Sequence, residues 1–195
     1  MGRGALDTTV SSGIPERVLL FSGHMVDRPD RPQPRFPADK VAVAARRIAE
    51  LLASLASGPG DIAFTQGAAG GDLLFAEACL ARGVDLHLLL PLPEKEFIAA
   101  SILPSADGAN WQQRYRSVCQ RLHGPPAVLA ADDGNPYVRG NQWLLQHALA
   151  WGAERLHFIC LWDGSNGDGD GGTADMIEEV RRRGGRIDWI DSRQL

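Results

Sequence analysis

Short apolar runs alternate with helical patterns of apolar residues from residue 17 to the C-terminus. The runs predict strands at residues 17–22, 61–66, 84–90, 127–130, 155–162 and 186–190. The intervening patterns predict helices at residues 41–55, 94–101, 111–122 and 141–151, and two more that end at residues 81 and 183. This alternation predicts an α/β fold with three layers, α/β/α, around a doubly wound, mostly parallel, Rossmann-like sheet.

The alternation continues without a linker or an internal repeat, which indicates one domain over residues 17–195. Residues 1–16 are expected to form a disordered leader, because they lack the apolar core of a signal peptide. Leu6 also stands where a myristoylation motif has Ser or Thr. No apolar run approaches the roughly 20 residues of a membrane helix, so we expect no membrane partner.

Glycine-rich loops follow three of the predicted strands, at the edge where open parallel sheets bind ligands. Gly23 and His24 follow the first strand, Gly67–Asp72 the second, and a stretch that ends in Gly171, Gly172 and Thr173 the fifth. The last two loops precede helices, where free N–H groups and the helix dipole favour anions. The pattern favours a nucleotide-like ligand. The alternative is a pair of tight turns without a ligand, with Asp72 as a helix cap.

Three arginines, Arg28, Arg31 and Arg35, lie in a proline-rich loop on the side of the predicted sheet that carries His24. The arginine fork suits phosphate groups, so the loop is a candidate clamp, although the same arginines could serve solubility alone. His24 at a strand end is either a general base or ligand donor, or a buried histidine bonded to a carbonyl group.

Composition and charge narrow the function classes. Hydrophobic residues make up 44% of the chain, enough for a core, and the net charge of -4 argues against nucleic acid as a partner. The three cysteines lie far apart, with neither metal-ligand nor disulfide spacing, which favours a reducing cytoplasm.

An acidic stretch before the last helix raises a calcium alternative. Asn166, Asp168 and Asp170 match the first, third and fifth positions of an EF-hand loop. The last position of such a loop needs a bidentate Glu, but Ile177 stands there. We therefore expect neither a metal nor a cofactor.

Together, several short motifs in a fixed order resemble the Rossmann-like SLOG superfamily, above all its members in bacterial signalling proteins. The motifs are Phe21–Asp27, Arg35–Pro37, Gly67–Glu77, Leu90–Pro91, Phe97, Ser101, Trp111, Arg114–Tyr115, Trp162–Gly164 and Gly171–Asp175. The resemblance implies a sensor that binds nucleotides or nucleotide-derived messengers, or an enzyme that acts on them. Relatives include the Lonely Guy phosphoribohydrolases, which carry a catalytic glutamate, and the DNA-processing protein A domain.

In this chain Met176 stands where those hydrolases carry the catalytic glutamate, with Asp175 and Glu178 as substitutes on one helix face. We therefore expect a ligand sensor rather than an enzyme. Nucleotide N-glycosidic hydrolysis and a protein-interaction domain with a vestigial pocket are the alternatives. A sensor of this size is expected to form a homodimer or to recruit a signalling partner. The expected ligand-binding residues are Gly23, His24, Arg35, Gly67, Ala68, Gly70, Gly71, Asp72, Glu77, Asp163, Gly171, Gly172 and Thr173.

Overall fold

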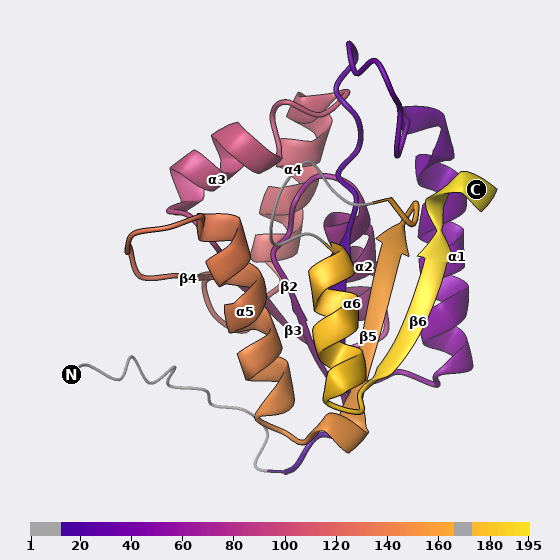
Figure 1. Ribbon diagram of the computed structural model, residues 1–195, viewed down its shortest axis with the longest axis vertical. Helices are drawn as coiled ribbons and strands as arrows, with labels where there is room; N and C mark the ends of the chain where they lie inside the picture. The colour runs from indigo at the N-terminus through magenta and orange to yellow at the C-terminus, as the bar shows by residue number, and fades with distance from the viewer. Residues whose placement is uncertain (1–12, 166–172) are drawn as a thin grey trace.

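A parallel sheet forms the centre of the computed structural model, which describes residues 13–165 and 173–195 (Figure 1). Within these residues the sheet has six strands in the order β4-β3-β2-β1-β5-β6, and every pairing is parallel. The strands are β1 (Val18–Gly23), β2 (Ile62–Thr65), β3 (Asp85–Leu90), β4 (Ala127–Val128), β5 (Leu156–Trp162) and β6 (Arg186–Asp191).

Helices cover both faces of this sheet. In the described residues they are α1 (Val41–Ser54), α2 (Gly71–Ala81), α3 (Glu94–Ser101), α4 (Gly108–Cys119), α5 (Pro136–Leu149) and α6 (Thr173–Arg182). Short 3₁₀ turns occur at Ala38–Lys40, Ala153–Arg155 and Ser192–Gln194. Figure 1 shows α5 and α6 in front of the sheet and α1 and α2 behind it. The predicted three-layer α/β/α fold is therefore confirmed.

Side chains along β1 alternate between the two faces of the sheet and so contribute to both halves of the core. Leu19 and Phe21 belong to a buried cluster with side chains of α1, α2, α3 and α4. Val18 and Leu20 belong to the opposite cluster, with side chains of α5 and α6. Successive strand residues point to opposite faces, so a strand with both faces covered is apolar throughout.

Three predicted elements have bounds that differ by more than one residue: α4, which spans residues 108–119 rather than 111–122, α5 and β4. Helix α5 starts at Pro136, five residues before the predicted start, because the Asn135 side chain accepts hydrogen bonds from Tyr137 N (2.9 Å) and Val138 N (3.4 Å). An asparagine cap followed by proline is a favourable helix start. Strand β4 has two residues rather than four, since it pairs only with the end of β3.

The order of the strands reverses direction between β1 and β5. The chain leaves β1 through α1 to reach β2 on one side, and it leaves β5 through α6 to reach β6 on the other. The two helices lie on opposite faces, so a crevice opens beyond the carboxyl ends of β1 and β5. None of the helices in the described ranges is both long and apolar enough to span a membrane.

Candidate functional site

A histidine–aspartate contact joins the carboxyl ends of β1 and β5. His24 follows β1, and its backbone N–H donates to Leu161 O (2.9 Å). Its Nε2 accepts from the backbone N–H of Asp163 (3.1 Å) and lies 3.2 Å from Asp163 Oδ1. Burial lowers the pKa of His24, although Asp163 opposes this shift, and the charge of Arg35 lowers it further. The lowered pKa favours the neutral ring, and the contacts of Nε2 with Asp163 fix the ring at the end of β5.

Asp163 is held as a carboxylate in a short turn after β5. Burial raises the pKa of Asp163, but hydrogen bonds from Ser165 and the proximity of His24 outweigh it and leave the pKa at about 2. Ser165 donates to Asp163 Oδ1 from its backbone N (2.9 Å) and its Oγ (2.7 Å). The Trp162 indole N–H donates to Ser165 O (2.7 Å) and so holds the turn against β5.

Asp27 organises the loop that carries the three arginines, residues 28–35, which we call the arginine loop. One buried carboxylate oxygen, Asp27 Oδ2, accepts from the backbone N–H groups of Arg35 and Phe36, each at 2.8 Å. The other oxygen lies 3.4 Å from Arg31 Nε. At the far end of the loop, Ser192 Oγ donates to Arg35 O (3.1 Å). The loop is thus tied to Asp27, in the segment after β1, and to the C-terminal turn.

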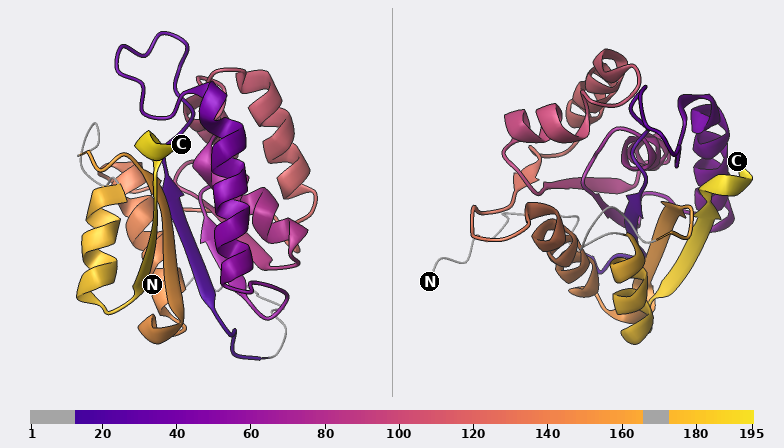
Figure 2. Two further views of the ribbon diagram at one scale, coloured as in Figure 1. Left: turned by 90° about the vertical axis from the view of Figure 1, so that its right-hand side faces the viewer. Right: turned by 45° about the horizontal axis from the view of Figure 1, so that its top comes forward.

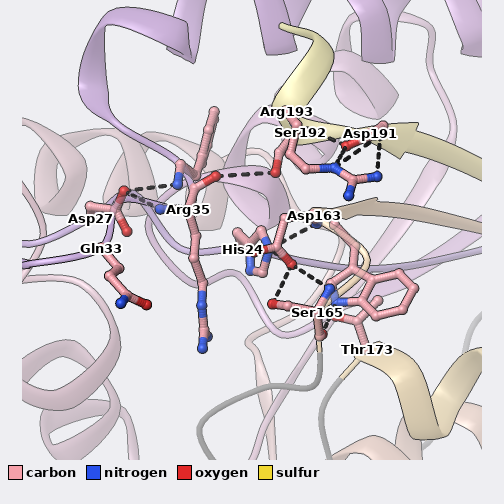
Figure 3. Close-up of polar contacts among 12 residues, drawn as sticks. His24, Asp27, Gln33, Arg35, Asp163, Ser165, Thr173, Asp191, Ser192 and Arg193 are labelled. Atoms are coloured by element: carbon pink, nitrogen blue, oxygen red, sulfur yellow. Dashed lines mark hydrogen bonds and ion pairs between the residues drawn. The ribbon is translucent and has the colours of Figure 1, made fainter.

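These groups surround one open cavity of about 1030 Å³. Its lining includes His24, Asp163 and Ser165 from the sheet end and Arg28, Arg31 and Arg35 from the arginine loop. Figure 3 shows the Arg35 side chain extending from the loop on the side where His24 and Asp163 lie. The volume is that of a site for a ligand of nucleotide size. The guanidinium groups of the three lining arginines can bind phosphate oxygens, and the His24 ring can form a hydrogen bond with a ligand.

The start of α6 also reaches the end of β1. Thr173 Oγ1 lies 3.2 Å from Ser22 Oγ, which places one predicted ligand-binding residue beside the crevice (Figure 3). Gly171 and Gly172, and the calcium candidates Asn166, Asp168 and Asp170, lie outside the described residues. Among the residues that are described, no three His, Cys, Asp or Glu side chains gather as metal ligands.

The Gly67–Asp72 loop has a different role from the anion site that its glycines suggested. Asp72 accepts from Gly67 N (3.1 Å) and Ala68 N (3.3 Å), Ala69 N donates to Ser101 O (2.9 Å), and Gly71 N donates to His24 O (3.1 Å). These four N–H groups already have acceptors inside the protein. In this conformation they are not available to a phosphate.

The glycines of this loop serve close packing against the segment after β1. Gly70 has φ +117°, and a Cβ there would lie 2.6 Å from Val26 N and 2.8 Å from His24 O. A Cβ at Gly71 would lie 2.9 Å from the Phe21 ring. A side chain at either position would therefore disturb the fold itself, not only a ligand site.

Three predicted acidic residues lie away from the cavity. Glu77 forms a bidentate pair with Arg114 of α4 (2.7 and 2.6 Å), and Arg114 stacks on the Trp111 ring at 4.1 Å. Glu77 thus fastens α2 to α4. Asp175 and Glu178 are exposed on α6, and Asp175 lines a separate groove of about 690 Å³ between α5 and α6. Neither carboxylate lines the His24 cavity.

Three residues of the site are absent from the ligand-binding residues expected from the sequence: Asp27, Ser22 and Ser165. The sequence signal for Asp27 is its position at the start of a loop, because an acidic residue there can accept hydrogen bonds from the loop's free N–H groups. Serine is common at strand ends, so the sequence does not distinguish Ser22 or Ser165. Their roles follow from the contacts with Thr173 and Asp163 that the structure shows. In the comparisons with known proteins, no protein-family model and no curated protein matches the chain.

Proposed function

We propose that this chain is a sensor domain that binds a phosphate-bearing, nucleotide-type ligand in the His24 cavity. The observation that carries the proposal is the convergence of the three arginines, His24 and Asp163 on one cavity at the switch point between β1 and β5. The resemblance to the SLOG superfamily supports the same ligand class. The three free thiols, of which Cys79 and Cys160 are buried, fit a reducing cytoplasm as the place of action.

The chemistry of the lining assigns a part of the ligand to each group. Arg28, Arg31 and Arg35 would hold phosphate oxygens, because guanidinium forks bind them in charge-assisted pairs. The carboxylate of Asp163 accepts hydrogen bonds and would receive a ribose hydroxyl or a base amino group. Ser22 and Thr173, whose hydroxyl oxygens lie 3.2 Å apart at the end of β1, are not part of the cavity lining. Hydrolysis is not part of the proposal, since Asp175 and Glu178 do not line this cavity.

A thermal-shift screen tests the proposal with nucleoside monophosphates, ADP-ribose, cyclic ADP-ribose and cyclic dinucleotides. A ligand at 100 times its dissociation constant stabilises the fold by about 2.7 kcal/mol, which raises the melting temperature by several degrees. Adenosine and ribose are the matched controls without phosphate and should shift the melting temperature little. If no phosphate-bearing compound stabilises the protein, or if adenosine does so equally, the proposal is wrong.

A further inference from the structure

The C-terminal turn, Ser192–Gln194, is fastened to the segment that carries the arginine loop. Ser192 is fully buried. Its Oγ donates to Arg35 O (3.1 Å), and its own carbonyl oxygen accepts from Lys40 Nζ (3.1 Å). Figure 2 shows the turn beside the start of α1 in both views, and beneath the arginine loop in the left view. Two hydrogen bonds of one buried residue therefore join the turn to the arginine loop and to the start of α1.

The same turn reaches the other side of the cavity through Arg193. Asp191 orients the Arg193 guanidinium, with contacts at Nε (2.9 Å to Oδ1) and at Nη2 (2.7 Å to Oδ2). This guanidinium lies close to the turn after β5, since a Cβ on Gly164 would lie 3.5 Å from Arg193 Nη2. The pKa of Arg193 is raised, chiefly by Asp191 and further by the charge of Asp163. The C-terminal turn thus lies against both segments that supply the cavity lining.

Arg35 is the residue through which a ligand and the C-terminal turn meet. Its backbone N–H donates to Asp27 Oδ2 (2.8 Å), its carbonyl oxygen accepts from Ser192 Oγ, and its side chain lines the His24 cavity. A phosphate group held by that side chain restricts the same residue whose carbonyl group anchors the turn. Ligand binding and docking of the turn therefore favour each other, and the coupling acts in both directions.

We propose that Ser192 and Lys40 are positioning residues for the ligand site, and that the C-terminal turn is the part of the domain that responds to the ligand. The response rests on the proposed function, whereas the contact between the turn and the arginine loop does not depend on it. Neither Ser192 nor Lys40 lines the cavity, so both act through Arg35. A sensor requires an element outside its ligand site that differs between the free and the bound state.

Limited trypsin digestion of the ligand-free protein tests whether the turn holds the loop. Trypsin cleaves after arginine but not before proline, and Arg28 and Arg31 each precede a proline. Among the three arginines of the loop, only Arg35 therefore offers a cleavable bond, and that bond includes the carbonyl group that Ser192 binds. Cleavage requires local opening, so its rate follows the population of the open loop. Ser192→Ala and Lys40→Met should each raise this rate about fivefold or more, because one hydrogen bond is lost.

Three controls keep this test specific. Lys95→Met removes an exposed lysine on α3 and should be cleaved after Arg35 at the wild-type rate. Lys40→Arg keeps a donor for Ser192 O and should restore most of the resistance. Cleavage after Arg116, within α4, reports global unfolding and should not change. Lys40→Met keeps the test valid if Ser192→Ala fails to fold. Equal cleavage after Arg35 in the wild type, Ser192→Ala and Lys40→Met would overturn the proposal.

Hydrogen exchange tests whether the turn responds to a ligand. The probe is inorganic pyrophosphate, and sodium chloride at equal ionic strength is the control. At saturation, pyrophosphate should slow the exchange of the amides of residues 191–194 about tenfold or more, while those of residues 127–129, at the opposite sheet edge, should not change.

The two proposals fail in different ways. Pyrophosphate that raises the melting temperature without slowing exchange at residues 191–194 would overturn the response of the turn and leave the proposed function intact. If pyrophosphate neither raises the melting temperature nor slows this exchange, the proposed function fails, and with it the response of the turn. The trypsin rates still decide in that case whether Ser192 and Lys40 position Arg35.

Discussion

Asp27→Ala is expected to destabilise the protein and to release the arginine loop. The substitution removes the acceptor of two backbone N–H groups, those of Arg35 and Phe36, and the Phe36 side chain is fully buried. Because each hydrogen bond to a charged group contributes about 1.5–3 kcal/mol, a loss of about 3 kcal/mol in the free energy of unfolding is expected. Nucleotide binding should also fall, since Arg35 is no longer held beside His24.

Two matched variants test whether the effect of Asp27→Ala comes from the lost hydrogen bonds, from the lost charge, or from the loss of any aspartate in this loop. Asp27→Asn keeps an oxygen for both N–H groups but loses the charge beside Arg31, so its effect should be smaller than that of alanine. Asp30→Ala removes an exposed aspartate from the same loop and should leave stability nearly unchanged. Urea unfolding measures all three. Equal stability of Asp27→Ala and Asp30→Ala would show that Asp27 does not organise the loop.

The buried carboxyl of Asp72 should make the protein less stable as pH rises toward neutrality. Burial raises the pKa of Asp72 to about 7, although the amides of Ala68 and Gly67 oppose the shift. Between about pH 4 and pH 7 the folded state therefore keeps a proton that the unfolded chain has lost. The protonated Asp72 carboxyl therefore contributes to the free energy of unfolding, and this contribution is fully present below about pH 4. It declines by about 4 kcal/mol as pH rises through 7.

Asp72→Asn isolates this contribution, because the amide oxygen can still accept from Gly67 and Ala68 but does not titrate. Relative to the wild type, the variant should gain stability steadily from about pH 4 to about pH 7. Asp163→Asn is the contrasting variant: with its pKa at about 2, Asp163 contributes stability that is lost only as pH falls below about 4. Urea unfolding at several pH values measures both differences. A constant difference for Asp72→Asn would show that Asp72 is ionised throughout.

The fold was predictable because its signal is local. A buried parallel strand must be apolar on both faces, so continuous apolar runs such as Val18–Phe21 and Phe158–Leu161 predict strands directly. Helix α3 was predicted with its observed bounds, since Glu94 and Ser101 are flanked by clear breaks in the pattern. The start of α5 was missed because it depends on the Asn135 cap and not on apolar spacing.

The site was only partly predictable because its signals depend on partners far along the chain. Gly23, His24, Arg35 and Asp163 meet at one cavity, as their positions after strands or in the arginine loop suggested. The glycines of the Gly67–Asp72 loop gave the same signal, yet Gly70 is needed for contact with Val26. Composition alone does not distinguish a loop that glycine opens to a phosphate from one that glycine packs against a neighbouring backbone.

Calorimetric titration tests the central claim, that the His24 cavity binds the nucleotide, most directly. The titrant is the compound that stabilises the protein most in the thermal-shift screen. The account predicts that Arg35→Ala weakens binding about tenfold or more, because a charge-assisted hydrogen bond to phosphate is lost. Asp175→Asn, in the groove between α5 and α6, should bind like the wild type. Equal affinity of Arg35→Ala and the wild type, or lost binding in Asp175→Asn, would contradict the account.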